Sequence, residues 1–242
     1  MTRNMVFTSA GDHTNFHELW THPYAKPDYD IYVIYYGDNL HQYEKYKQNV
    51  QWIEQRKGSK FQNFFWFYRN HLEILDQYDY FFILDDDLVF YTLDINQMFS
   101  IAREYELSIC QPSFLPESVV SHKITLQNDA TFLRYTNFVE VNSPLFNKEA
   151  LINTMRVMDD SLIGFGIDYL MIWANGMYEK NKYAVIDMIA CVNPTQECKK
   201  IVRREMYHVF DFDSEKDRWD SYAEKIGCPP EFPHKSYAFV LL

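Results

Sequence analysis

Short apolar runs alternate with longer polar or amphipathic segments through the first half of the chain. Continuous aromatic and aliphatic runs predict buried strands at 4–8, 30–36 and 79–84. The segments between and after them predict helices at 41–56, 61–77 and 93–106. In the last of these, apolar residues recur at helical spacing, as in an amphipathic helix that covers a sheet. This alternation indicates βαβ units.

The second half has the same building blocks, but its pattern does not give the directions of the strands. Strands are predicted at 107–112, 119–127, 138–142 and 183–192, and helices at 148–158, after Asn147 as a cap, and at 168–175. Neither an internal repeat nor a linker-like stretch is visible. We therefore predict one α/β domain over residues 1–242, with a core of about 4–195 and a peripheral C-terminal tail at 196–242.

Composition narrows the class of protein. The chain is 47% hydrophobic and 18% aromatic, enough for a substantial core. Its formal charge of -11 disfavours general binding to nucleic acids or anionic membranes. The four cysteines match no zinc spacing. The chain does not begin like a signal peptide, and no apolar stretch reaches the roughly 20 residues of a transmembrane helix, so we expect a cytoplasmic protein.

Three consecutive carboxylates, Asp85, Asp86 and Asp87, follow the buried run at 79–84 and precede a second apolar run. Adjacent acids repel each other, and a divalent cation is the simplest compensation. The carboxyl ends of strands in an open α/β sheet are also where ligands bind. If the strand persists, Asp85 and Asp87 share a face. A solvated acidic turn is the alternative, but the apolar flanks favour a metal-assisted site for a phosphate-bearing ligand.

The segment Gly164-Phe165-Gly166-Ile167-Asp168-Tyr169 places an acid near the start of a predicted helix. Asp168 is either a helix cap or a general base that deprotonates an attacking hydroxyl. The sequence alone does not separate these two roles.

The loop after the first strand is a candidate nucleotide site. Thr8, Ser9 and Ala10, with Asp38 after the second strand, would line the same edge of the sheet as the acids. Neither a dinucleotide-binding glycine fingerprint nor a P-loop motif is present, which argues against a dehydrogenase or a P-loop enzyme. Lys60 is the basic candidate for a phosphate contact, with a plain surface lysine as the alternative. Among histidines without zinc-site spacing, His208 is the best candidate for an additional metal ligand.

The order of these motifs resembles a known family. It runs from the first-strand loop through Lys60, Tyr78-Asp79-Tyr80-Phe81 and Leu84-Asp85-Asp86-Asp87-Leu88 to Ile109-Cys110-Gln111-Pro112-Ser113, Ser121-His122-Lys123-Ile124-Thr125, Phe138-Val139-Glu140, the 164–169 segment and Val185-Ile186-Asp187. Over about residues 5–195 the chain resembles the DUF707 group, whose members are regarded as glycosyltransferases of the GT-A type with a D-x-D motif.

The resemblance implies a GT-A fold, a single nucleotide-binding α/β sandwich around a mostly parallel central sheet flanked by helices. It implies a nucleotide-sugar donor, preferably a UDP-sugar, and Mn²⁺ or Mg²⁺ as cofactor. Asp87 matches the metal-binding aspartate, while Asp85 matches the one near the ribose or metal, and we group Asp86 with the donor-binding residues. Asp168 falls at the catalytic base of inverting members, and Glu140 falls near the acceptor pocket.

One position departs from the pattern that such a family implies. A histidine would be expected after the last strand, where this chain has Val192-Asn193. The third metal ligand is therefore Asn193 through its carbonyl oxygen, His208, or no protein group at all.

These expectations combine into a metal-dependent, inverting glycosyltransferase that moves a hexosyl or pentosyl group to a glycan or other hydroxyl acceptor. A nucleotidyltransferase or nucleotide-sugar pyrophosphorylase is one alternative, although it would usually carry a glycine-rich loop and more basic residues. A non-catalytic carbohydrate-binding module is another, although the spacing of most aromatics assigns them to the core.

Overall fold

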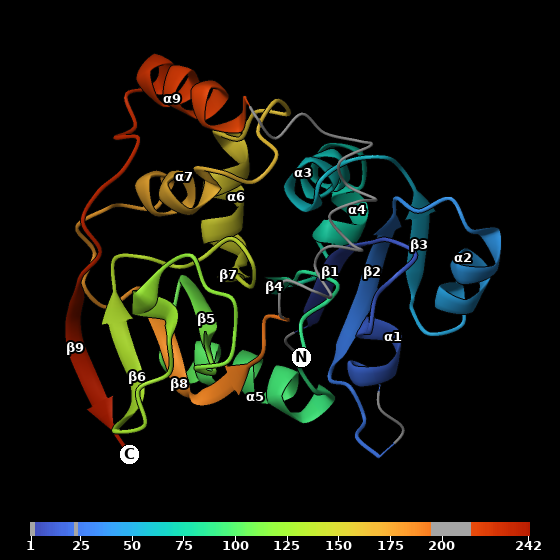
Figure 1. Cartoon of the computed structure of the whole chain (residues 1–242), viewed down its shortest axis with the longest axis horizontal. Helices are drawn as coiled ribbons and strands as arrows, with labels where there is room; N and C mark the ends of the chain where they lie inside the picture. Colours follow the sequence, from blue (N-terminus) through green and yellow to red (C-terminus); the bar gives the residue numbers. More distant parts are fainter. Residues whose placement is uncertain (1–2, 22–23, 195–213) are drawn as a thin grey trace.

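The computed structural model describes residues 3–21, 24–194 and 214–242. Its centre is a nine-stranded sheet in the order β3-β2-β1-β4-β7-β5-β8-β6-β9 (Figure 1). The strands are β1 (Asn4–Ala10), β2 (Tyr29–Tyr35), β3 (Trp52–Gln55), β4 (Tyr80–Ile83), β5 (Ile109–Phe114), β6 (Thr131–Thr136), β7 (Leu145–Asn147), β8 (Tyr183–Cys191) and β9 (Ser236–Leu241).

The sheet is mixed, and this corrects the predicted mostly parallel sheet. β1 pairs in parallel with β2 and β4, and β2 pairs in parallel with β3. The short strand β7 then runs antiparallel to both β4 and β5. Beyond it β5 and β8 are parallel, whereas β6 is antiparallel to β8 and β9. The parallel half is thus the half in which strands and helices alternate along the chain.

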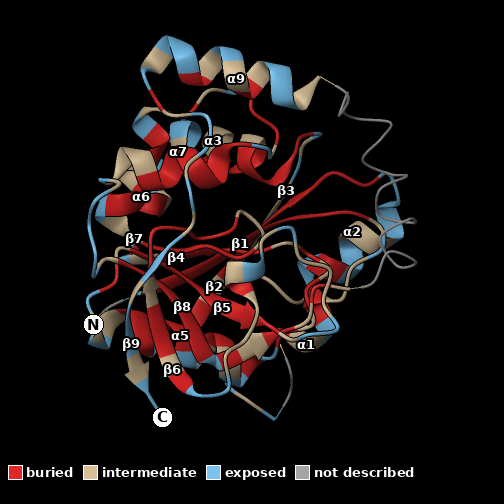
Figure 2. Ribbon diagram, turned by 60° about the vertical axis from the view of Figure 1, so that its left-hand side comes forward, coloured by how far each residue is buried: buried red, intermediate tan, exposed pale blue. Residues whose placement is uncertain are grey.

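Helices cover both faces of the sheet. They are α1 (Phe16–Leu19), α2 (Leu40–Lys47), α3 (Lys60–Asn70), α4 (Leu72–Leu75), α5 (Thr92–Glu104), α6 (Lys148–Arg156), α7 (Ile167–Ala174) and α9 (Glu215–Ile226). Alternate residues of β1 face opposite layers, as the period of a strand requires. Met5 and Phe7 pack with α3, α6, α7 and α9, while Val6 packs with α1, α2 and α5. Two buried layers result, one on each side of the sheet (Figure 2).

Several predicted elements differ in the structure. The predicted helix at 41–56 divides into α2 and the edge strand β3, and the helix at 61–77 divides into α3 and α4. The predicted strand at 119–127 is replaced by a short 3₁₀ turn, Lys123–Thr125, and an isolated β-bridge from Leu126 to Phe114. The predicted strand at 138–142 is a largely buried loop rather than a strand. The polar groups at its end form hydrogen bonds within the protein. These bonds take the place of the backbone hydrogen bonds that a neighbouring strand would make.

The predicted peripheral tail also needs correction for its described part. Trp219 of α9 is fully buried, and its indole nitrogen donates to the backbone oxygen of Pro230 at 2.8 Å. β9 closes one edge of the sheet against β6. Residues 214–242 are therefore part of the packed fold. In the described residues, no helix combines the length and the apolar character that crossing a membrane requires.

Candidate functional site

The acidic turn lies where β4 ends. β4 stops at Ile83, and the amide of Leu88 approaches the carbonyl oxygen of Asp85 at 3.5 Å, so residues 85–88 form a turn. The strand therefore does not persist, and the condition under which Asp85 and Asp87 share a strand face is not met. The side chain of Asp86 instead accepts a hydrogen bond from the backbone amide of Gly11 at 2.9 Å.

The loop after β1 is fastened to this turn. The Asn15 side chain donates to the carbonyl oxygen of Asp87 at 3.0 Å, and the Asn15 amide donates to that of Asp86 at 3.3 Å. Asp86 is only 6% exposed, so this carboxylate organises the edge of the sheet from inside. The structure thus brings the first-strand loop and the acids together at one edge of the sheet, as the sequence predicted.

The individual residues predicted in the first-strand loop have internal roles. The hydroxyl of Thr8 donates to the carbonyl oxygen of Leu84 at 2.8 Å, and the Ser9 hydroxyl accepts from Asn63 at 2.7 Å. Ala10 is fully buried. These internal hydrogen bonds occupy the two hydroxyls, and their contact with a nucleotide stays a prediction. Asp38, in contrast, is exposed and forms a 2.8 Å ion pair with Lys57.

Lys60 links the acidic turn to a distant loop. It is the first residue of α3, a helix that begins with a capping box at Ser59. Its ammonium group donates to the carbonyl oxygens of Val141 at 2.7 Å and Asn142 at 2.9 Å, and it pairs with the Asp85 carboxylate at 2.7 Å. An ammonium has three hydrogens, and these three contacts use all of them. Lys60 is buried at 8% exposure, so it is not a plain surface lysine, and its contact with a phosphate stays a prediction.

Asp168 lies deep on the other side of this loop. Gly166, at a φ of 85°, occupies the N-cap position of α7, so Asp168 is not the cap. A side chain at Gly166 would also collide with the Trp219 ring, which explains the glycine. The Asp168 carboxylate accepts a hydrogen bond from the amide of Val141. The loop at 140–142 therefore touches Lys60 through its carbonyls and Asp168 through an amide.

The electrostatic setting of Asp168 is unusual for an aspartate. Burial, and then the nearby carboxylate of Glu140, raise the pKa of Asp168 to about 8. The Val141 amide and the Lys60 charge act in the opposite direction, but they do not cancel the first two effects. A buried carboxyl with a pKa near neutrality is a candidate proton acceptor.

Glu140 is held in place by side chains that the sequence analysis did not single out. It is 2% exposed, and its two carboxylate oxygens accept from Thr125 at 3.2 Å and from Asn142 at 3.1 Å. Its backbone amide donates to the side-chain oxygen of Gln111 at 2.5 Å. Gln111 carries the one signal that could have revealed it, since it is an amide within the apolar run of β5.

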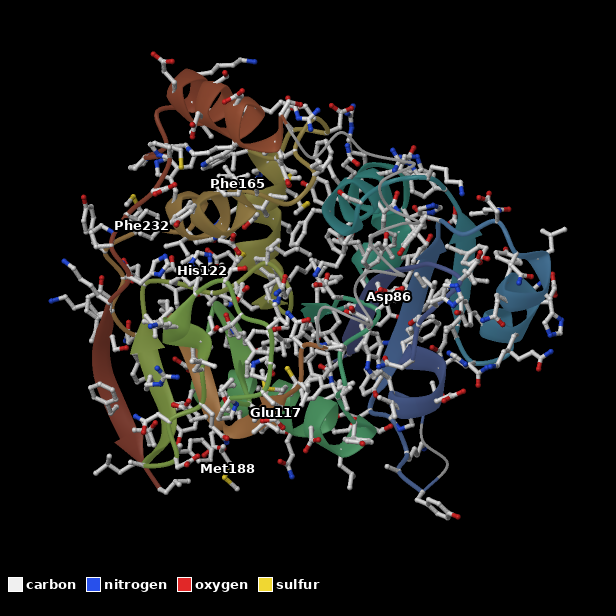
Figure 3. All side chains as sticks on the ribbon, viewed as in Figure 1. Asp86, Glu117, His122, Phe165, Met188 and Phe232 are labelled. Atoms are coloured by element: carbon white, nitrogen blue, oxygen red, sulfur yellow. The ribbon has the colours of Figure 1, made fainter. Side chains whose placement is uncertain are left out.

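A group of rings adjoins the buried carboxyl pair. The rings of His122 and His234 are 4.9 Å apart, and both contact Phe138. Tyr169, which follows Asp168, stacks on His234 and meets the Phe232 ring edge to face. Figure 3 shows His122 and Phe232 beside α7, across the molecule from Asp86. Burial lowers the pKa of both histidines, that of His234 to about 4.

The acidic turn is the candidate cation site. Within residues 3–21, 24–194 and 214–242, no group of three His, Cys, Asp or Glu side chains is placed to hold a metal. His208 lies outside these residues. Asn193 directly follows a β-bridge between Val89 and Val192, which brings it near the turn. Its side-chain oxygen is buried and has no hydrogen-bond partner in the described part of the chain. Carboxylates and an amide oxygen form a set of hard donors that fits Mg²⁺ or Mn²⁺.

The family comparison assigns the chain to a family by sequence. The model described as "Protein of unknown function (DUF707)" matches residues 5–137, more than half of the chain. The protein belongs to this family. The matched region includes β1 to β6 and the acidic turn, and it ends before Glu140 and Asp168. No curated protein matches the chain in sequence.

Solved structures show the same fold. Staphylococcus aureus TarS superposes with a TM-score of 0.52 at 13% identity, covering 93% of this chain and 43% of TarS. TarS 1-349 in complex with UDP-GlcNAc gives 0.53 at 12% identity, covering 93% and 72% of the two chains. The complex of TarS 1-349 with UDP gives 0.51 at 12% identity, covering 93% and 71%. The chain thus spans less than half of the longer TarS chain, and the similarity concerns the fold.

Proposed function

We propose that this protein is a glycosyltransferase that moves a hexosyl or pentosyl group from a nucleotide sugar, preferably a UDP-sugar, to a hydroxyl acceptor. TarS, which has the same fold, binds UDP and UDP-GlcNAc in its solved complexes. Fold alone does not define an activity, so the proposal depends on the site. A nucleotidyltransferase and a carbohydrate-binding module remain the alternatives that the experiment below separates.

The observation that carries the proposal is the placement of Asp168. Its buried carboxyl has a pKa raised to about 8, and one loop, 140–142, connects it to the acidic turn through Lys60. A base of this strength accepts a proton efficiently near neutral pH. A site of this kind also needs a separate place for the leaving group, and the acidic turn at the sheet edge supplies one.

In the proposed step, Asp168 takes the proton of the acceptor hydroxyl. The hydroxyl oxygen forms a bond to the anomeric carbon, and the bond from that carbon to the diphosphate oxygen breaks. The nucleoside diphosphate leaves with the electron pair, and the configuration at the anomeric carbon inverts. Glu140 lies beside Asp168 and is proposed to face the acceptor. Asp86 and the loop that it holds are proposed to border the donor.

Asp85 and Asp87 would hold Mn²⁺ or Mg²⁺, and we propose Asn193 as the third protein ligand because its buried side-chain oxygen has no hydrogen-bond partner in the described part of the chain. The ion supplies positive charge that neutralises a departing diphosphate. Because Lys60 already pairs with Asp85, Asp87 carries the larger part of this proposed role. A cytoplasmic location stays a prediction.

The test combines binding and turnover. The melting temperature is measured with UDP-, GDP- and other nucleotide sugars, with and without Mn²⁺, and release of the nucleoside diphosphate is followed in parallel. We expect stabilisation by one class of nucleotide and release of its diphosphate, stopped by EDTA and restored by Mn²⁺. Full turnover in EDTA contradicts the metal role. Stabilisation by glycans without any nucleotide effect supports a binding module instead, and turnover of nucleoside triphosphates supports a nucleotidyltransferase.

A further inference from the structure

A cleft of about 240 Å³ opens along α3, away from Lys60. Gln62, Phe65, Trp66 and Arg69 of α3 line it, together with Arg56 from the loop after β3 and Asp160 from the loop before α7. In Figure 1, α3 lies on the same side of the sheet as α6 and α7. The cleft thus lies between α3, the loop after β3 and the loop that leads to Asp168.

The cleft carries positive charge in a protein whose formal charge is -11. Arg56 lies over the Trp66 ring at 5.9 Å, and Arg69 lies over the Phe65 ring at 5.7 Å. In the described part of the chain, neither arginine has a carboxylate within ion-pair distance. Asp160 is the single acid of the lining, and it acts on Arg56 from a longer range. With two guanidinium groups and one acid that pairs with neither at close range, the lining of the cleft carries a net positive charge.

The chemistry of the lining defines the ligand. Guanidinium groups bind carboxylates and phosphates through paired hydrogen bonds. The partly exposed rings of Phe65 and Trp66 provide apolar area against which a sugar ring can pack. A volume of about 240 Å³ is below the range of about 300–1,000 Å³ that is typical of pockets for drug-sized ligands. This cleft therefore fits one small ring with an anionic group better than a complete nucleotide.

Hydrogen bonds connect the cleft to the candidate active site on two sides. Arg56 donates to the side-chain oxygen of Asn63, whose amide donates to Ser9 at the end of β1 at 2.7 Å. Gln62 donates to the carbonyl oxygen of Asp160 at 2.7 Å, at the start of the segment that continues to Asp168. A ligand in the cleft would thus lie beside the proposed site and outside the acidic turn.

We propose that this cleft binds an acidic monosaccharide unit, carrying a phosphate or a carboxylate, of the acceptor. That the bound sugar belongs to the acceptor rests on the proposed function. Binding itself needs neither donor nor metal, so it is tested separately.

The experiment is calorimetric titration of the full chain with glucose 6-phosphate, glucuronate, glucose and inorganic phosphate. Four proteins are compared, namely the wild type, Arg69→Gln, Arg69→Lys and Arg156→Gln. Arg156 is exposed on α6, does not line the cleft, and serves as a matched loss of one charge. Arg56 is left unchanged because it also holds Asn63. Circular dichroism checks that each variant is folded.

We expect saturable binding of glucose 6-phosphate or glucuronate, weakened at least tenfold by Arg69→Gln, less by Arg69→Lys, and unchanged by Arg156→Gln. The tighter of the two ligands identifies the anionic group. Equal affinity for glucose or for inorganic phosphate, equal weakening by Arg156→Gln, or no saturable binding would overturn the inference. If binding depends on Arg69 but no nucleotide sugar is turned over, the proposed function fails while the cleft stands. Turnover without such binding refutes the cleft alone.

Discussion

The acidic turn at 85–87 and the buried pair of Glu140 and Asp168 are both groups of carboxylates, but their surroundings differ. In the turn, Asp85 pairs with Lys60, and Asp86 accepts from the amide of Gly11. In the buried pair, each acid adds to the electrostatic cost of the other, and the pKa of Asp168 rises to about 8. The acids of the turn are thus held by a cation and an amide, whereas the buried acid with a raised pKa suits proton transfer.

Lys60 joins these two regions, because it contacts Asp85 and the carbonyls of the loop that donates to Asp168. Mutations can therefore test how the two regions differ. Changes at Asp168 should affect chemistry, changes at Lys60 should affect the fold around both regions, and changes at Glu140 should affect the pH dependence.

The largest effect is expected for Asp168→Asn. Asn keeps an oxygen that accepts from the Val141 amide, but it cannot take a proton. Sugar transfer should fall by at least about 100-fold, the usual contribution of a general base. Donor affinity should remain, as measured by titration with the nucleotide sugar. Unchanged turnover would remove Asp168 from the mechanism, and Asp129→Asn, at an exposed site, is the matched control.

The pH dependence of the free energy of unfolding of Asp168→Asn tests the raised pKa of Asp168. The pKa of Asp168 rises from 3.8 to about 8 on folding, so the native state binds more protons than the unfolded state between these values. This group therefore lowers the free energy of unfolding as the pH rises through that window. Asp168→Asn should remove this decline, as seen in urea denaturation from pH 5 to pH 9. A steeper decline in the variant would contradict the raised pKa.

Lys60→Met tests the connection between the two regions. It leaves the Asp85 carboxylate and two carbonyl oxygens without their donor. Because removing one partner of a largely buried ion pair is costly, the free energy of unfolding should fall by about 3 kcal/mol. Lys57→Met breaks the exposed pair with Asp38 and should cost less than about 1 kcal/mol. Equal losses of unfolding free energy in the two variants would show that the contacts of Lys60 contribute no more than an exposed ion pair.

Glu140→Gln separates the two causes of the raised pKa of Asp168. Gln can keep hydrogen bonds to Thr125 and Asn142 while its negative charge is lost. Without that charge the pKa of Asp168 should fall, and the rise of transfer rate with pH should move to lower pH by about one unit. An unchanged pH profile would mean that burial alone sets the pKa. The control is Glu117→Gln, on the loop after β5.

The smallest effect is expected at the rings beside the buried pair. Burial, and then His122, lower the pKa of His234 to about 4, so its native state binds fewer protons than the unfolded state below pH 6.5. Stability from this group is thus lost as the pH falls from 6.5 to about 4. His234→Phe keeps a ring and should reduce the acid loss by at most about 1 kcal/mol, since the site is only half-buried. His41→Phe, at an exposed site, should leave the acid slope unchanged.

The sequence predicted the first half of the fold better than the second. Long apolar runs gave β1, β2 and β4, and their alternation with helices gave parallel pairing. β7, with three residues, is too short for a periodic signal, yet it reverses the direction of the sheet. The strand-like alternation at 138–142 was misleading, because this segment is held as a loop: its amides donate to Gln111 and Asp168, and Lys60 donates to its carbonyls.

The site shows the same division. Asp85, Asp86 and Asp87 were visible because three adjacent acids interrupt an apolar run. Asp168 was visible as an acid after two glycines. Only the structure, which places Gly166 at the N-cap of α7, excludes the role of helix cap for Asp168. The contact of Lys60 with Asn142 joins residues 82 positions apart, and no local pattern encodes such a distance. The arginines of the cleft were missed because they come together only on the surface of the folded protein, and no local sequence pattern connects them.

The most direct measurement is a crystal soaked with UDP-sugars and Mn²⁺. The account predicts density for the diphosphate and the ion at the 85–87 turn, with the anomeric carbon of the sugar facing Asp168. A nucleotide sugar bound elsewhere, with no ion at the 85–87 turn, would contradict it.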